Sequence, residues 1–293
     1  MLVIKSNDKK HKRIIVLPEK ITIIQVGGNI ESALKGDYQI DVKAIFTEAW
    51  QQTLRSRISM NVGLLFSVLL GMLVSFIGSN YLGGIEAVLA NPQASMLLNV
   101  VVTVAVWPFL GAVEMMGVSH AVGLKTHARM TFSFLARASW VVLCALFTSV
   151  LISIGFQLLI LPGIFLAITL SLTIPLVIEK KMTPMKAIIL SIQTLRFKFL
   201  SLLYIFVVLF LSLVLLFMPL ALLIESSFAP LGIVVLLTGL SFLAPLYYNI
   251  KGILYREIFG ISIATDKYIG NLQDVTKVAP KAIKSDSDDT FSA

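Results

Sequence analysis

Apolar residues in this chain gather into long runs that short polar segments separate. The longest run, residues 139–178, contains no Asp, Glu, Lys, Arg or His. It is twice the ~20 residues that one helix needs to cross a bilayer. Leu161, Pro162 and Gly163 lie near its middle, and proline lacks a backbone donor while glycine tolerates a left-handed φ. The run therefore predicts two membrane-spanning helices joined by a tight hairpin at these three residues.

The same pattern recurs before and after this run and predicts six spans in all. We place them at residues 58–79, 96–118, 139–160, 163–178, 200–224 and 231–254. The polar flanks give a head over 1–40, a membrane domain over 41–260 and a tail over 261–293. In the head, the β-branched runs Ile14–Leu17 and Ile21–Val26 are candidates for a small hairpin. The tail has too little apolar surface to fold alone, and we expect it to be disordered.

Two amphipathic helices are predicted beside these spans. Asp41 offers an N-cap to a helix over 42–55, and Thr183 offers one to a helix that begins with Pro184. Both helices contain the sequences Lys-Ala-Ile and Gln-Thr-Leu-Arg. A weaker counterpart at 131–138 precedes the third span. The chain therefore resembles a threefold repeat of surface helix, span, short outer turn and span.

Composition supports a polytopic all-α membrane protein. The chain is 57% hydrophobic and 14% charged, whereas a soluble domain carries about 25% charged residues. The net charge is +8, but no basic stretch belongs to a recognisable nucleic-acid module, so we expect no nucleic-acid partner. The basic surface instead favours contact with anionic lipid headgroups.

The positions of the basic residues predict the orientation. Of the 24 Lys and Arg, ten precede the first span, three lie between spans two and three, five lie between spans four and five, and six follow from Lys251 onward. The loops on the other side carry only Glu86 and Glu225. By the positive-inside rule, both termini and the surface helices face the cytoplasm of a cell with an inner (plasma) membrane.

The first span carries a stripe of small residues at every fourth position. The stripe consists of Ser59, Gly63, Ser67, Gly71, Ser75 and Ser79. Small residues let two helix backbones approach closely, so the stripe predicts internal packing, with a homo-oligomer seam or a lipid groove as the alternative. Weaker stripes appear as Ala145, Ser149 and Ser153, and as Gly163, Ala167 and Ser171.

Glu114 is the ionisable residue that we place within a span, and it is a candidate functional site for that reason. Its position near the cytoplasmic end of span two also allows a structural role. His120 and His127 flank the following turn, where two histidines without a cysteine indicate a solvated loop rather than a metal site. The sequence shows no phosphate loop, catalytic carboxylate pair, nucleophile elbow or zinc motif. It predicts no catalytic residues, no metal and no cofactor.

A family resemblance comes from residues between about 120 and 255. The short motifs that carry it are Leu161-Pro162-Gly163, Glu179-Lys180-Lys181, Thr183-Pro184, Ala187 and the Gln-Thr-Leu-Arg helix. They resemble the YciC-like bacterial inner-membrane proteins and the membrane domain fused to some glycerophosphodiester phosphodiesterases. The resemblance implies a six-span membrane fold. It carries over no catalytic residues, because the phosphodiesterase chemistry belongs to a separate soluble domain.

These observations favour a non-enzymatic inner-membrane protein with an envelope- or lipid-associated scaffold role. Expected partners are membrane lipids, and a second copy of the chain or another membrane protein. The alternative is a small transporter or permease with a polar cavity at mid-membrane, which the repeat, the prolines within spans and Glu114 support. We rank it second, because the packing stripes, the amphipathic segments and the lack of catalytic constellations favour the scaffold. A single carboxylate without a second buried charge is thin evidence for a proton or ion path.

Overall fold

The computed structural model describes residues 23–264. Residues Gln25–Ser262 form one compact unit. This unit contains all the helices described below. The predicted strand at 14–17 and most of the predicted tail lie outside the described residues.

Six helical segments in this unit are long and apolar enough to cross a membrane, as predicted. They comprise α2 (Val42–Tyr81), α4 (Pro92–Ala121), α5 (Ala138–Leu158), α6 (Ile160–Thr169) with α7 (Thr173–Ile178), α9 (Phe199–Leu223) and α10 (Ala229–Phe259). The all-α polytopic membrane fold is therefore confirmed. The fourth span is short and interrupted between α6 and α7.

Shorter elements connect or flank the spans. They are β1 (Ile23–Val26), α1 (Ile30–Lys35), α3 (Ile85–Ala90), η1 (Ala128–Phe132), η2 (Leu135–Arg137), α8 (Pro184–Leu195), η3 (Arg196–Lys198) and β2 (Ile261–Ala264). β1 pairs with β2 in a two-stranded sheet. The strand formers before Gly27 thus pair with residues that directly follow the last helix, within the segment that we assigned to the tail.

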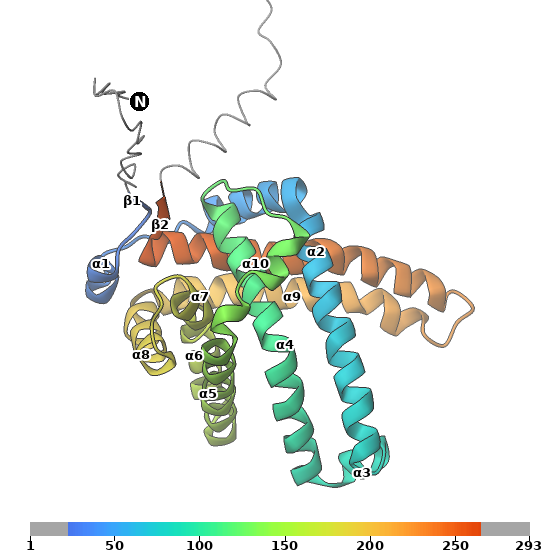
Figure 1. Cartoon of the computed structure of the whole chain (residues 1–293). Coiled ribbons are helices and arrows are strands. Elements are labelled where there is room, and N and C mark those ends of the chain that lie inside the picture. Colours follow the sequence, from blue (N-terminus) through green and yellow to red (C-terminus); the bar gives the residue numbers. More distant parts are fainter. Residues whose placement is uncertain (1–22, 265–293) are drawn as a thin grey trace, which may run out of the picture. The chain divides into compact units, whose positions relative to one another are not determined.

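The predicted surface helices adjoin the spans without a break. α2 includes both the amphipathic segment and the first span, and the Asp41 side chain caps it by accepting a hydrogen bond from the Ala44 N–H. No proline interrupts its 40 residues, so the helix continues. Figure 1 shows that its first part and its later part run in different directions. α8 with η3 likewise precedes α9. The predicted counterpart at 131–138 is not one helix, because the end of η1, a turn at 133–134 and η2 occupy those residues before α5 begins.

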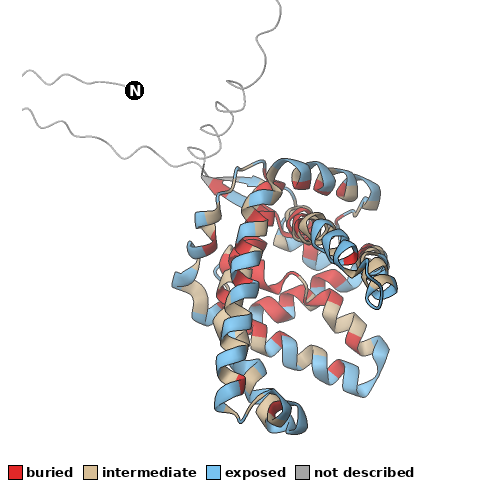
Figure 2. Ribbon diagram, turned by 90° about the vertical axis from the view of Figure 1, so that its right-hand side faces the viewer, coloured by how far each residue is buried: buried red, intermediate tan, exposed pale blue. Residues whose placement is uncertain are grey.

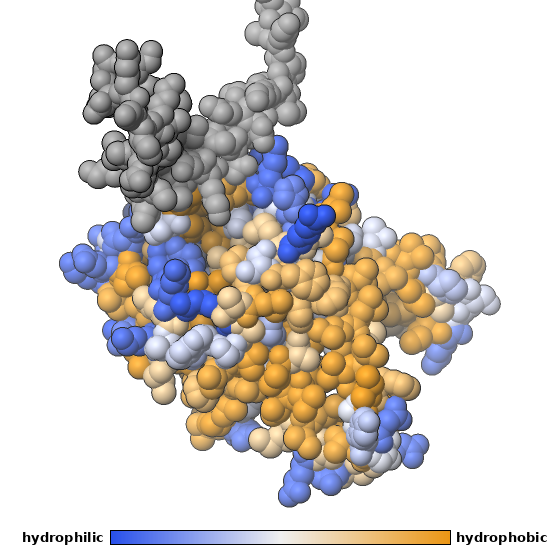
Figure 3. All heavy atoms as spheres, viewed as in Figure 1, coloured by the Kyte–Doolittle hydropathy of each residue, from blue (hydrophilic) through white to orange (hydrophobic). Residues whose placement is uncertain are grey.

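The spans form three antiparallel hairpins, α2 with α4, α5 with α6, and α9 with α10. Figure 1 shows the α9–α10 hairpin pointing in a different direction from the α2–α4 hairpin. Buried residues concentrate in the C-terminal parts of α4 and α10, and the outer parts of the hairpins are exposed (Figure 2). Hydrophobic residues cover the visible faces of the hairpins, and hydrophilic residues gather at the upper left and at the hairpin tips (Figure 3). Exposed apolar faces of this extent are suited to contact with lipid.

The hairpin between the third and fourth spans exists, but its turn is not at Leu161, Pro162 and Gly163. The chain reverses at Leu159, an extended residue with φ −163° and ψ 155°, and the three predicted residues form the first turn of α6. Proline is tolerated there because the first N–H groups of a helix have no partner within it. Gly163 serves packing instead, since a Cβ on it would overlap the ring of Phe156.

Candidate functional site

The site begins with a close crossing of α4 and α10. A Cβ on Gly252 would overlap the carbonyl oxygen of Gly117, and a Cβ on Gly117 would overlap that of Tyr248. Two glycines therefore allow the helix backbones to touch. Glu114 on α4 and Lys251 on α10 lie within one turn of these glycines, and the crossing brings their side chains together.

Glu114 and Lys251 form a buried ion pair between spans two and six. Lys251 Nζ donates a hydrogen bond to Glu114 Oε1 at 2.5 Å, and the two side chains are 6% and 5% exposed respectively. Lys251 also lies 5.5 Å from the centroid of the Tyr247 ring. We had counted Lys251 among the basic residues that follow the last span, and that interpretation was wrong. The signal was present, since the apolar run continues through Leu254.

Two buried polar atoms near this pair have no hydrogen-bond partner among the described residues. They are Oε2 of Glu114 and Oγ of Ser171. An unpaired buried acceptor costs about 1–3 kcal/mol, and more when it is charged. Both residues line the same cavity. The cavity therefore contains two hydrogen-bonding atoms, Glu114 Oε2 and Ser171 Oγ, that are available to a ligand.

The cavity has a volume of about 380 Å³ and lies among α4, α5, α6, α7, α9 and α10. Its lining is Trp107, Glu114, Ala145, Thr148, Ser149, Ile152, Ala167, Ile168, Leu170, Ser171, Thr173, Ile174, Phe206, Tyr247, Tyr248 and Lys251. Members of both weaker stripes contribute to it, namely Ala145 with Ser149, and Ala167 with Ser171. Their small side chains leave the space that larger residues would fill.

The main stripe of α2 faces α4. Gly63 and Ser67 are buried, and a Cβ on Gly63 would lie 3.0 Å from Val113 Cγ2. Further along the helix, a Cβ on Gly71 would lie 3.3 Å from Val106 Cγ2. These three members of the stripe therefore pack against α4 within the chain.

His120 and His127 have different environments. His127 is exposed as expected, but His120 is only 4% exposed and hydrogen-bonds to Asn249 and Thr126. The interpretation of His120 as part of a solvated loop was wrong, because Asn249 of α10 supplies a buried partner from a distant part of the sequence. Within residues 23–264, no three His, Cys, Asp or Glu residues gather in a group that could hold a metal ion.

Polar contacts around the end of α10 fix it to α2 and to the end of α7. Arg256 Nη1 and Nη2 donate to Glu48 Oε1 and Oε2 at 2.6 and 2.9 Å. Tyr255 donates its hydroxyl to Glu179 Oε2 at 2.8 Å. The Ser262 N–H donates to the other oxygen of Glu179 at 3.1 Å. These contacts hold the end of α10, the helix that contributes Lys251 to the ion pair and to the cavity.

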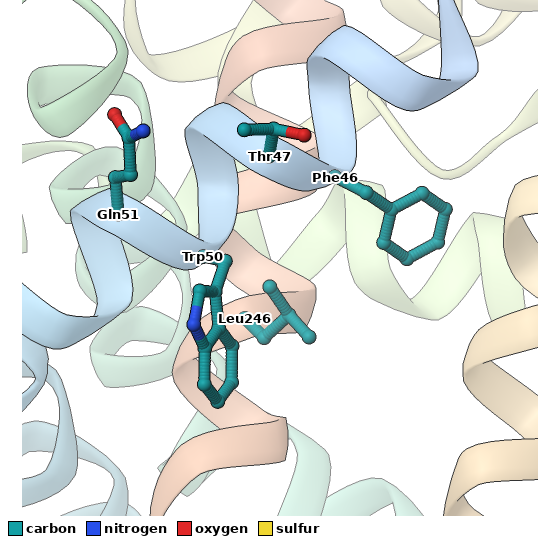
Figure 4. A pocket seen from close by; sticks show the side chains of 5 residues that line it. All are labelled: Phe46, Thr47, Trp50, Gln51 and Leu246. Carbon is teal, nitrogen blue, oxygen red and sulfur yellow. The ribbon is translucent and has the colours of Figure 1, made fainter.

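A second cavity, of about 420 Å³, lies between α2 and α10. Figure 4 shows its lining residues, Phe46, Thr47, Trp50, Gln51 and Leu246. Trp50 stacks on Phe242 with the ring centroids 6.1 Å apart, and the Arg57 guanidinium lies 4.2 Å from the same ring. An exposed Trp beside a cation is typical of the headgroup region of a membrane. This cavity contains no charged lining residue, so it offers less chemistry than the first.

No family model, curated protein or solved structure matches this chain. The resemblance to the YciC-like proteins stays a prediction. The site is therefore interpreted from the chemistry of its own residues.

Proposed function

We propose that this chain is a non-enzymatic protein of a bacterial inner membrane whose cavity binds and moves a small polar solute or a lipid headgroup. The single observation that carries the proposal is the Glu114–Lys251 pair, with one carboxylate oxygen left unpaired at the cavity. From the sequence we ranked a scaffold above a permease, and Glu114 without a second buried charge was thin evidence for a transport path. Lys251 supplies that charge, so we reverse the order.

Cysteine labelling tests whether the cavity is accessible to water, as a transport function requires. In a Cys144→Ser background, we would place cysteines at Thr148 and Ser171 of the cavity and at Val150, which is 51% exposed on α5. We expect a membrane-impermeant thiol reagent to label the first two positions in membranes and to leave Val150, facing lipid, unlabelled. If both cavity positions are as shielded as Val150, the transport function is excluded.

The proposal also includes an orientation of the chain in the membrane. The charge pattern supports a location of both termini and of the basic loops in the cytoplasm, with basic side chains near the headgroups of anionic lipids. A tag at either terminus should be labelled only after the cells are permeabilised. Labelling of either tag from outside intact cells would contradict this orientation.

A lipid-associated scaffold is the second candidate, and the surface of α8 favours it. Ile188 and Leu195 are buried against the rest of the unit, whereas Met185 and Ile189 are 59% and 47% exposed. α8 thus packs through one face and presents two large apolar residues outward, as an interfacial helix does. Native mass spectrometry of gently extracted protein tests this role. A defined partner protein or a second copy would support it, and a bare monomer would contradict it.

A further inference from the structure

The charge balance of the site restricts its ligand. The carboxylate of Glu114 and the ammonium group of Lys251 cancel each other within a nearly fully buried pair. A ligand with a net charge would leave one charge uncompensated in a medium of low dielectric constant, and that is strongly unfavourable. The site therefore favours a ligand whose own charges sum to zero.

The unpaired atoms define which groups this ligand carries. An ionised carboxylate only accepts hydrogen bonds, and Oε2 of Glu114 has no donor among the described residues. A ligand ammonium group is the strongest donor for it, because the bond is then charge-assisted. The ammonium group of Lys251 has three donors, one of which is used by Glu114. An acidic oxygen on the ligand would accept from another, and the Ser171 hydroxyl lies in the same cavity.

The distribution of polar and apolar lining indicates the shape of the ligand. Glu114 is seven residues before the end of α4 at Ala121, so it lies ~10 Å along the axis from that end. Trp107 lies further from this end of α4, Ile152 is in the later half of α5, and both line the cavity. The charged pair therefore lies toward one membrane face, with Trp107 and Ile152 deeper in the cavity, an arrangement that suits a headgroup attached to an acyl chain.

We propose, on the basis of the proposed cavity function, that the cavity binds a zwitterion with an N–H-bearing ammonium group beside an acidic oxygen. The ammonium group contacts Glu114 Oε2 and the acidic oxygen contacts Lys251 Nζ. The same chemistry occurs in the headgroup of an ethanolamine phospholipid and in a free zwitterion of similar size. A choline headgroup is also zwitterionic, but its quaternary nitrogen has no N–H to donate.

Lipid retention measured by native mass spectrometry tests the proposal. The protein would be placed in phosphatidylglycerol nanodiscs that also contain either phosphatidylethanolamine or phosphatidylcholine. It would then be released from the nanodiscs, and the mass of the protein with its retained lipid would be measured. We expect retention of phosphatidylethanolamine to exceed that of phosphatidylcholine roughly tenfold, because only the ethanolamine headgroup can donate a hydrogen bond to the charged Glu114 carboxylate. Equal retention of the two lipids would overturn the proposal.

Variants connect the retained lipid to the cavity. Glu114→Gln with Lys251→Met removes both charges together and leaves no unpaired ion, so the fold should survive. We expect the double variant to retain phosphatidylethanolamine no better than phosphatidylcholine, and Ser171→Ala to weaken retention. Val150→Ala, on the exposed face of α5, is the matched control and should behave as wild type. A double variant that retains the lipid as wild type does would overturn the proposal.

A competition arm distinguishes the two sources of the zwitterion. Free glycerophosphoethanolamine would be titrated into the protein with its bound lipid. Displacement identifies a soluble zwitterion as a ligand, and retention of the lipid identifies the phospholipid. The absence of binding by both probes would overturn the inference. Cysteine labelling needs no ligand, so it tests the transport function independently of zwitterion binding. If the cavity is accessible to water but binds neither zwitterion, this inference is wrong and the transport function stands. If the cavity binds a zwitterion but is shielded from water, the transport function is excluded and this inference stands.

Discussion

His120 Nδ1 and Asn249 Oδ1 lie 2.8 Å apart, and this contact fixes the tautomer of the histidine. Asn249 uses its amide nitrogen to donate to Thr53 Oγ1 at 2.9 Å, so its oxygen faces His120 as an acceptor. Nδ1 of His120 therefore carries a proton, and in the neutral ring Nε2 accepts from the Thr126 hydroxyl, 2.7 Å away. One buried amide thus joins α2, α4 and α10.

Replacing Asn249 with Ala should destabilise this junction. The change leaves the Nδ1–H of His120 without its acceptor and removes the donor to Thr53. We expect a loss of about 1–3 kcal/mol in the free energy of unfolding, measured by denaturant titration in detergent. Asn80→Ala is the control, because Asn80 is exposed and bonds only to a carbonyl of its own helix among the described residues. A loss equal to that of the control would show that the junction contributes nothing.

Replacing only one residue of the Glu114–Lys251 pair should lower the free energy of unfolding more than replacing both. Glu114→Gln or Lys251→Met alone leaves one buried charge without its partner, and we expect a loss of about 3–5 kcal/mol for each. The double variant should recover most of that loss, which a double-mutant cycle of unfolding free energies will measure. Additive losses would mean that the two residues do not interact.

Gly252→Ala tests the close crossing of α4 and α10. The new methyl group would overlap the backbone of Gly117, which moves less easily than a side chain. We expect the crossing to widen and stability to fall by about 2 kcal/mol or more. Gly71→Ala is the matched control, since its Cβ would meet only the end of the Val106 side chain, at 3.3 Å. Thermal unfolding of both variants in the same detergent gives the comparison, and equal midpoints would contradict the crossing.

Arg256→Lys should loosen the attachment of α2 to α10. Arg256 holds both carboxylate oxygens of Glu48, a geometry that the single ammonium group of lysine cannot reproduce. We expect faster amide hydrogen exchange in the first turns of α2 and no change in α9. Unaltered exchange at the start of α2 would show that other contacts hold it.

Tyr38 makes stability sensitive to alkaline pH. Burial raises the pKa of its hydroxyl from 10.0 to about 12, and the hydroxyl donates to the Thr194 carbonyl at 2.8 Å. Between these values the unfolded chain releases a proton that the folded chain keeps, so this stabilisation is complete below pH 10 and is lost as pH rises toward 12. Tyr38→Phe should flatten the fall in stability over that interval, measured by unfolding at several pH values. An unchanged slope would contradict the assignment.

The sequence predicted the parts of the fold that depend on local pattern. Each span followed from an apolar run, and the Asp41 cap followed from a polar residue before a helical repeat. The turn was placed two residues late, because proline and glycine fit the first turn of a helix as well as a reversal. Small-residue stripes indicated close packing, but the identity of the packed partner required the structure.

The site itself was harder to predict, because its chemistry depends on a contact between residues far apart in the chain. Lys251 follows Glu114 by 137 residues, and near the end of an apolar run a lysine is typical of the membrane interface. Its burial is decided by the crossing of α4 and α10. The same crossing brings Asn249 to His120. Because this contact joins distant residues, the burial of His120 could not be predicted from its neighbours in the sequence.

The single residue between α5 and α6 limits how the cavity can change its width. With Leu159 alone as connection, and with Gly155 packed on Gly163, these two helices cannot separate at that end without unwinding. Five residues, 224–228, connect α9 to α10, so that hairpin has more freedom. We therefore expect the α5–α6 wall of the cavity to keep its shape at that end, so that any widening of the cavity there comes from movement of α9.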